Sequence, residues 1–396
     1  MNLTTSKTLK MKAAHRLRLL FVWFGTRPGH IGGGVVRLLE TNKVLHHYCD
    51  YRLITQKETY FWMKQLGLDA DVLYFVGGSW AWIATIPALL GCVLSTILHR
   101  QQRFETDIIY SSTHSFLHVL PSLLLKFRYR AKLVVYVTLS PLPRFRGRSL
   151  LEFLLLWFDR TTSLFLMRLW SDRIIVVNRA DAEELLNLGF HQKKIFVTGY
   201  GLDQEIIRKT QEFNREIDCV YLGRLAPAKG TTDLIHSWKE VTKFRNNARL
   251  TFVGPAWQDV LDDMKRQIRD LDLTSNVEII GPLYDQDKYN ILKKSKVMAL
   301  PSYEDTWCIA LSEAMACGCA AVAYDLPALR SVYGDSVMWA KTGNKNDMAK
   351  KIIILLENEA VRNEYVSRAK EFASKLDWKT IALEEFQNIE SLKKAM

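Results

Sequence analysis

The sequence is poor in cysteine, and its few cysteines do not have the spacing of metal ligands. Six cysteines are spread over 396 residues, and only Cys317 and Cys319 lie close together, on either side of Gly318 in an apolar stretch. Structural zinc sites need cysteine or histidine pairs at short fixed spacings, and disulfide frameworks are typical of small secreted domains. We therefore predict free thiols in a reducing, cytoplasmic compartment and no metal site.

The sequence also has no internal repeat, no low-complexity segment and no signal-peptide core. Its first apolar run, residues 19–24, is too short for such a core and suits a first β-strand. A length of 396 residues is enough for two domains, and a hydrophobic fraction of 48% is that of an ordinary folded protein. We expect a globular chain of two domains.

Acidic residues are scarce in the first half of the chain. Residues 1–200 contain 26 Lys and Arg against 13 Asp and Glu, a net charge of +13, whereas residues 201–396 contain 28 against 29, a net charge of −1. This asymmetry indicates an anionic partner for the first half, either nucleic acid or an anionic membrane surface. Because no basic motif of a nucleic-acid-binding fold is present, we predict the membrane surface and no nucleic acid.

The most informative stretch is residues 301–325, PSYEDTWCIALSEAMACGCAAVAYD. Its pattern predicts a loop after a buried strand, a helix over residues 308–317 and a further strand over residues 320–324. Parallel βαβ units bind ligands at the carboxyl ends of their strands. Asp305 lies in this loop and Glu313 in the helix. Two carboxylates suit a polyol, because each accepts several hydroxyl hydrogen bonds, and the free N–H groups of the helix start suit an anion.

Two further stretches carry candidate phosphate contacts. In residues 218–230, DCVYLGRLAPAKG, a strand is followed by a loop with Arg224 and Lys229 just before a helix. Two cations beside a helix start can clamp a diphosphate, and the alternative is a solvated basic loop. Glycines at 32–34 follow the first strand and open a helix, where a backbone can approach a phosphate closely.

The stretch 301–325 resembles the signature of the retaining glycosyltransferases of family 4 (glycosyl transferases group 1), which have the GT-B fold. In that signature a loop acid is followed by seven residues, a helix glutamate and the run Ala-Met-Ala-x-Gly, and Asp305 and Glu313 have this spacing. The Gly-Arg-Leu and Lys-Gly elements of residues 223–230 resemble a second pattern of the family. The resemblance implies an α/β protein with two Rossmann-like domains whose parallel sheets face a cleft.

Three positions depart from the family pattern. The family usually has glutamate where Asp305 stands, glycine where Cys308 stands, and a histidine near the sugar where Leu139 stands. The family retains the anomeric configuration, with the leaving phosphate serving as the base. A separate catalytic base is therefore not expected, and the missing histidine does not by itself exclude catalysis.

The resemblance also implies the domain boundaries. Residues 1–200 would form the N-terminal Rossmann-like domain, which binds the acceptor and faces the membrane. Residues 201–376 would form the C-terminal Rossmann-like domain, which binds the nucleotide sugar. Residues 377–396 would form a helix that packs back on the N-terminal domain.

The resemblance assigns roles to the site residues as well. Arg224 and Lys229 would bind the donor diphosphate and, with Asp305, form the catalytic group. Asp305 would hold the sugar hydroxyls, and Glu313 would hold those of the ribose. The remaining donor contacts would come from the glycine turn, the loop that cradles the base and the helix start: Gly33, Gly34, Leu283, Trp307, Cys308 and Ile309.

The function implied is transfer of a hexose-type sugar from a nucleotide-diphosphate sugar to a lipid-linked or glycan acceptor, with retention and without a further cofactor. A glycoside hydrolase using Asp305 and Glu313 as acid and base is a rival, but it leaves Arg224 and Lys229 without a role. A second rival is a non-catalytic subunit that binds sugar nucleotide or scaffolds a membrane glycosylation complex.

Two apolar segments in the first half bear on the membrane prediction. Residues 72–98 contain no charged residue, and residues 150–170 form an apolar helix preceded by Arg144, Arg146 and Arg148. A membrane span at 72–98 is rejected because the strands on either side of it belong to one sheet. For residues 72–98, burial against the sheet and binding at a membrane interface stay equally open, since Trp80 and Trp82 suit an interface. For residues 150–170 burial also stays open, but interfacial binding is favoured. We predict a peripheral protein on the cytoplasmic face of a membrane.

His114 and His118 follow the strand predicted over residues 106–111. Their spacing of four residues would allow a metal or acid–base pair on one helix face. We favour the simpler interpretation that both are polar residues at the domain cleft.

Overall fold

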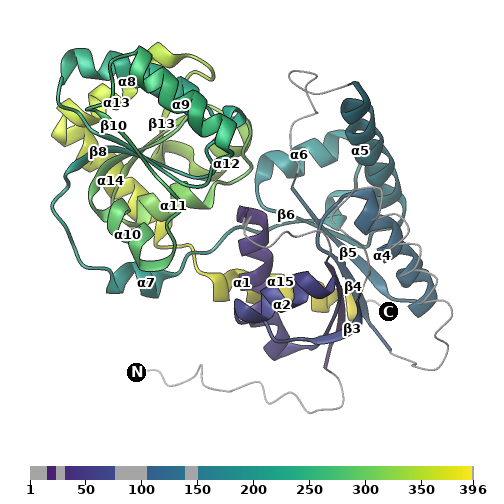
Figure 1. Cartoon of the computed structure of the whole chain (residues 1–396). Helices are drawn as coiled ribbons and strands as arrows, with labels where there is room; N and C mark the ends of the chain where they lie inside the picture. Colours follow the sequence, from purple (N-terminus) through teal and green to yellow (C-terminus); the bar gives the residue numbers. More distant parts are fainter. Residues whose placement is uncertain (1–15, 24–31, 76–104, 139–149, 395–396) are drawn as a thin grey trace, which may run out of the picture.

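The computed structural model describes residues 16–23, 32–75, 105–138 and 150–394 of the chain, and it contains two α/β domains (Figure 1). The strands of the N-terminal domain are β1 (Arg18–Trp23), β2 (Asp50–Thr55), β3 (Asp71–Phe75), β4 (Ile108–Ser111), β5 (Lys132–Val137), β6 (Arg173–Val176) and β7 (Ile195–Val197). Its helices are α1 (Gly33–Tyr48), α2 (Lys57–Gln65), α4 (Phe116–Tyr129), α5 (Leu150–Trp170) and α6 (Arg179–Asn187).

The C-terminal domain follows the short helix α7 (Gln204–Lys209). Its strands are β8 (Ile217–Leu222), β9 (Leu250–Val253), β10 (Val277–Ile280), β11 (Ser295–Leu300), β12 (Ala320–Tyr324) and β13 (Met338–Ala340). Its helices are α8 (Thr231–Phe244), α9 (Gln258–Asp270), α10 (Asp285–Lys293), α11 (Ile309–Ala316), α12 (Pro327–Tyr333), α13 (Lys345–Glu357) and α14 (Glu359–Ala373), and the chain ends in α15 (Trp378–Lys393).

Both sheets are parallel and have the strand order of Rossmann folds. The N-terminal order is β3-β2-β1-β4-β5-β6-β7, and the C-terminal order is β10-β9-β8-β11-β12-β13. Their central strands are continuous apolar runs because helices cover both faces of each sheet. In each sheet the strand order reverses beside the first strand, between β1 and β4 and between β8 and β11, and these switch points are where such folds bind ligands.

The N-terminal sheet separates two apolar layers. Phe21 and Tyr136 face the layer that contains α1, and this layer is continuous with the core of the C-terminal domain. Val22 and Val135 face the opposite layer, together with Leu123 of α4. Figure 1 shows α5 at the outer side of the N-terminal domain, away from the C-terminal domain.

The chain crosses between the domains twice, at neighbouring positions. Leu202, on the first crossing, forms a β-bridge with Asp377 on the return crossing. Gly201 is needed here, since a β-carbon at this position would lie 2.3 Å from the backbone nitrogen of Trp378. After the return, α15 packs against α1 of the N-terminal domain (Figure 1).

The predicted fold class, two Rossmann-like domains with parallel sheets, is confirmed. The helix over residues 309–316 and the left-handed residue after it, Gly318 with φ +81°, also agree with the sequence pattern. Helix α5 is long, but nine of its large apolar side chains are exposed, so it is not a buried helix. Among the residues that the structure describes, no helix is long and apolar enough to span a membrane.

Several sequence predictions lie outside the described residues. These are Leu139, the arginines at 144, 146 and 148, and most of the uncharged segment 72–98, of which only the part that forms the end of β3 is described.

Candidate active site

The switch point of the C-terminal sheet brings two candidate loops together. Strand β8 pairs with β11, so the loop of residues 223–230 and the loop of residues 301–308 leave the sheet side by side. They are in close contact, because Gly230 has φ +69° and a β-carbon there would lie 1.9 Å from the carbonyl oxygen of Pro301. Only glycine fits this position. The loops that carry the predicted cations and the predicted loop acid are therefore neighbours.

Lys229 joins the two loops. Its ammonium donates a hydrogen bond of 2.8 Å to the carbonyl oxygen of Glu304 and lies 3.0 Å from Oδ2 of Asp305. The second contact is an ion pair rather than an aligned hydrogen bond, and Oδ2 is a buried oxygen without a hydrogen-bond partner among the described residues. Oδ2 of Asp305 is therefore held beside a fixed cation without an aligned hydrogen bond.

Arg224 lies on the same edge with an exposed side chain. Its carbonyl oxygen accepts a hydrogen bond of 2.9 Å from the Tyr221 hydroxyl, which fixes the backbone of the loop. Within the described part of the chain the guanidinium has no ion-pair partner. A fixed backbone with an unpaired guanidinium suits the binding of an external anion.

Glu313 projects from the second turn of α11 and is almost fully buried, with 8% of its surface exposed. Its Oε1 accepts hydrogen bonds from Lys288, at 2.6 Å, and from the Tyr289 hydroxyl, at 3.2 Å, both on α10. No sequence motif marks these two partners. The pattern of α10 predicts only a helix, and its contact with α11 follows from the tertiary fold.

The start of α11 has an unusual backbone. Cys308 directly precedes the helix with φ 63° and ψ 82°, a conformation that favours glycine, which is the residue the related pattern has at this position. Burial raises the pKa of the Cys308 thiol well above its ordinary value, and the nearby Asp305 carboxylate adds to this effect. The thiol is therefore neutral at physiological pH and is not a nucleophile.

Trp307 is directed toward the domain junction. Its ring centroid lies 5.3 Å from that of Tyr200, which belongs to the first crossing, and its Nε1 donates to Ser312 at 3.2 Å. Its carbonyl oxygen accepts from the Tyr333 hydroxyl at 2.8 Å. Because the ring is buried, only the backbone N–H of Trp307 remains for contact with a ligand.

The N-terminal domain approaches the same loop from the other side of the cleft. A β-carbon at Gly33, the first residue of α1, would lie 3.5 Å from the Ile309 side chain, while Gly34 faces open space. Asn178, at the end of β6, donates a hydrogen bond of 3.0 Å to the carbonyl oxygen of Thr306. The glycine turn and the start of α11 therefore lie against each other, and Asn178 is a cross-domain contact that the sequence analysis missed.

The other predicted residues lie farther from this centre. Leu283 follows the edge strand β10 and is half-buried against the core of its domain. His114 follows β4; burial and the positive charge of Arg160 lower its pKa to about 4. Its ring is therefore neutral at pH 7. In the described part of the chain no group of three metal-ligating side chains occurs.

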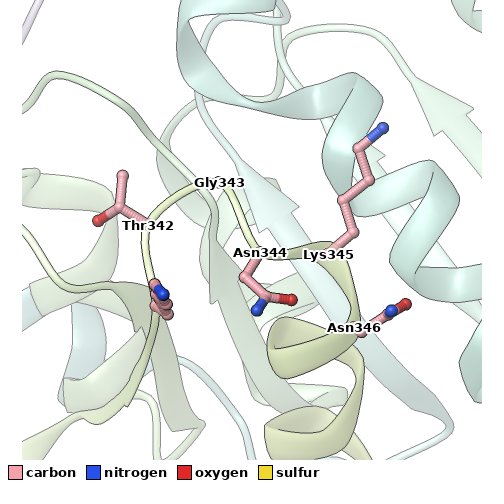
Figure 2. A pocket seen from close by; sticks show the side chains of 6 residues that line it. Thr342, Gly343, Asn344, Lys345 and Asn346 are labelled. Atoms are coloured by element: carbon pink, nitrogen blue, oxygen red, sulfur yellow. The ribbon is translucent and has the colours of Figure 1, made fainter.

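A separate hollow lies in the loop between β13 and α13, lined by residues 341–346 (Figure 2). Lys345 lies there 3.8 Å from Asp233, whose other oxygen accepts a hydrogen bond of 2.8 Å from Tyr324. Lys345 is thus paired with a carboxylate from α8, and no sequence motif marks this hollow.

The sequence of the C-terminal domain matches a known family. The model of the family described as glycosyl transferases group 1 matches residues 203–372. The matched residues contain both loops of the site, and Arg224, Lys229, Asp305 and Glu313 all lie within them.

Solved structures match the whole chain. HepE from Anabaena, in complex with UDP and glucose, has 19% identity and a TM-score of 0.74 over 95% of this chain and 100% of that one. Sucrose-phosphate synthase from Thermosynechococcus elongatus has 15% identity and a TM-score of 0.76 over 96% of this chain and 100% of that one. These likenesses show the GT-B fold for both domains.

Curated relatives match part of the chain. An N,N'-diacetylbacillosaminyl-diphospho-undecaprenol alpha-1,3-N-acetylgalactosaminyltransferase of Campylobacter jejuni is 26% identical over 54% of this chain and 58% of its own length. A phosphatidyl-myo-inositol mannosyltransferase of Mycolicibacterium smegmatis is 29% identical over 41% of this chain and 42% of its own length. The chain thus spans about half the length of the curated relatives it matches.

Proposed function

We propose that the protein is a retaining glycosyltransferase that moves a hexose-type sugar from a nucleotide-diphosphate sugar to a lipid-linked acceptor. The observation that carries this proposal is the ion pair of Lys229 with Asp305 at the switch point of the C-terminal sheet, in the loop that also carries the exposed Arg224. The two cations suit the phosphates of a nucleotide-diphosphate sugar, and the carboxylate suits its sugar hydroxyls.

The cations serve the departing diphosphate. Arg224 has a free guanidinium that can bind two phosphate oxygens, and Lys229 has N–H donors beyond the one it gives to Glu304. The N–H groups of Ile309 and Ala310, at the start of α11, add donors on the same side. Negative charge grows on the diphosphate as the glycosidic bond breaks, so these groups bind the transition state more tightly than the ground state.

The carboxylates hold the two polyol parts of the donor. Asp305 offers its unpartnered Oδ2 to a sugar hydroxyl. Glu313 is held by Lys288 and Tyr289 through Oε1, which leaves Oε2 for the ribose hydroxyls. In a retaining reaction of this class the leaving phosphate takes the acceptor proton, so no protein base and no further cofactor is required.

The acceptor is proposed from the relatives and from the charge of the chain. The names of the two relatives include a diphospho-undecaprenol and a phosphatidyl-myo-inositol, both lipid-linked acceptors. The net charge of +13 over residues 1–200 suits an anionic membrane surface. We therefore propose a peripheral location on the cytoplasmic face of a membrane, with the acceptor bound between that surface and the cleft.

A non-catalytic sugar-nucleotide-binding subunit is the alternative, and the strained Cys308 favours it, since the helix start it precedes is where the diphosphate would bind. The alternatives are separated by turnover of radiolabelled UDP-, GDP- and ADP-sugars with a membrane lipid extract as the acceptor. Transfer of label into lipid supports the enzyme, whereas nucleotide binding without transfer supports the subunit.

The placement of the diphosphate is tested by Arg224→Ala. We expect this variant to lose roughly 100-fold to 1,000-fold in transfer rate, as for removal of one transition-state donor, with unchanged folding. Arg266→Ala, which removes an exposed arginine of α9, is the matched control. If both variants turned over like the wild type, the diphosphate would not bind at Arg224.

A further inference from the structure

More than half of the large, exposed apolar side chains of the described residues lie on two neighbouring helices. Helix α4 contributes Leu120, Leu124 and Phe127, and α5 contributes nine residues from Leu150 to Trp170. We call these side chains the α4–α5 face. Folded monomers seldom expose a continuous apolar patch of this extent unless it binds a partner.

The α4–α5 face is continuous because the two helices are parallel neighbours. Phe116 and Phe158 have ring centroids 6.0 Å apart near the start of α4, and Phe127 and Trp170 have centroids 6.2 Å apart at its end. Asp159 of α5 accepts hydrogen bonds from the hydroxyl and backbone of the α4 start, at Ser115 Oγ (2.8 Å) and Phe116 N (3.0 Å). These contacts fix the two helices as one surface.

The α4–α5 face runs along the full length of both helices. Both helices follow the carboxyl ends of their strands, β4 and β5, and this edge of the sheet is where such folds bind ligands. Because Phe116 lies beside Phe158, the first two turns of α5 extend beyond the start of α4. Exposed leucines occupy these turns, among them Leu151 with 67% and Leu155 with 51% of the side chain accessible.

The charges that the structure places around the α4–α5 face are mostly basic. Helix α4 contains no acidic residue, and Arg128 and Arg130 are exposed at its end. Asp159 is half-buried in the contact with α4, and Asp172, which follows α5, pairs with Lys126. Apolar side chains with tryptophans among them and arginines at the margin suit the interface of an anionic bilayer.

We propose that the α4–α5 face docks on the surface of an anionic bilayer, inserting its leucine and aromatic side chains below the headgroups. The inference rests on the proposed function only in identifying the membrane as the place of the acceptor. It assigns the docking to a defined surface, with the leucines of the first turns of α5 against the lipid, at the end of the N-terminal sheet that carries the carboxyl ends of its strands.

The test is flotation of the full chain with vesicles of phosphatidylglycerol and phosphatidylcholine, at about 0.1 M and 0.5 M NaCl. Charge contacts weaken with salt, whereas apolar insertion does not. We expect wild-type binding to persist in part at the higher salt. The double variant Leu151→Glu/Phe165→Glu should bind about tenfold less at both salt concentrations.

The matched control is Phe61→Glu/Phe244→Glu, which places two charges on equally exposed phenylalanines of α2 and α8. It should float like the wild type. Wild-type protein that stays unbound, or a double variant that floats normally, would overturn the proposal. A wild-type dimer that the Leu151→Glu/Phe165→Glu variant converts to a monomer would overturn it too, by assigning the face to a second copy. Binding of UDP, measured in parallel, tests the donor site independently, so failure of one proposal does not imply failure of the other.

Discussion

Cys308 is the residue whose conformation is least expected for its type. Its φ of 63° costs an ordinary side chain about 1 kcal/mol, and glycine avoids this cost. We predict that Cys308→Gly stabilises the chain by roughly 0.5–1 kcal/mol, seen as a higher midpoint in urea unfolding at unchanged slope. Ala310→Gly, in the right-handed first turn of α11, should instead destabilise it by about 1 kcal/mol. Equal effects of the two substitutions would mean that Cys308 is not strained.

Asp305 and Glu313 are carboxylates that we assign to different parts of the donor. The two assignments predict different losses in the binding of UDP and of UDP-sugar. Glu313→Gln should weaken binding of free UDP and of UDP-sugar alike, because the ribose is common to both. Asp305→Asn should weaken binding of UDP-sugar and leave free UDP nearly unchanged, because only the sugar part of the ligand would contact Asp305. Calorimetric titration of each variant with both ligands checks this. Parallel losses in the two titrations would overturn the assignment of ribose and sugar.

Helix α15 is the element that ties the end of the chain to the N-terminal domain. Its Glu385 forms an ion pair of 2.5 Å with Arg37 of α1, and both side chains are essentially inaccessible. Glu385 also accepts a hydrogen bond of 2.7 Å from Tyr110, and Arg37 donates one of 2.9 Å to the carbonyl oxygen of Gly199 at the crossing. The network thus joins α1, β4, α15 and the first crossing.

Removing one partner of this network leaves a buried charge alone. We predict that Glu385→Ala destabilises the chain by about 3–5 kcal/mol, because Arg37 has no access to water. The adjacent exposed residue gives the control, and Glu384→Ala should change stability by less than about 0.5 kcal/mol. Thermal unfolding of the two variants side by side is the measurement. A Glu385→Ala protein as stable as the control would show that the ion pair contributes nothing.

The same elements show what the sequence could and could not predict. Strands β8, β11 and β12 were predictable because apolar runs alternate with helix patterns, and the meeting of Lys229 with Asp305 follows from strand order. Arg37 and Glu385 look like ordinary surface residues of amphipathic helices, and only the tertiary fold brings them together across 348 positions. Helix α5 was recognisable as apolar, but its exposure depends on what covers it, which periodicity does not reveal.

At the scale of the whole molecule, the candidate active site and the α4–α5 face contact opposite faces of the N-terminal sheet. The start of α11 touches α1 and the first crossing through Ile309 beside Gly33 and Trp307 against Tyr200. The α4–α5 face lies on the other side of the N-terminal sheet, in the separate apolar layer of Leu123. A ligand bound by the loop of residues 301–308 should therefore stabilise α1 and the first crossing between the domains, but not α4 and α5.

Hydrogen exchange followed by mass spectrometry measures this directly. With saturating UDP we expect slower exchange in residues 217–230 and 301–316, and also in residues 33–48 and 199–203, because the bound loop restrains its partners across the cleft. Anionic vesicles should instead slow exchange in residues 116–129 and 150–170 and leave residues 301–316 unchanged. Glu385→Ala should reduce the effect of UDP on residues 33–48, since α15 helps to hold α1 in place. Protection by UDP confined to the C-terminal domain would mean that the contacts of Trp307 and Ile309 do not couple the domains.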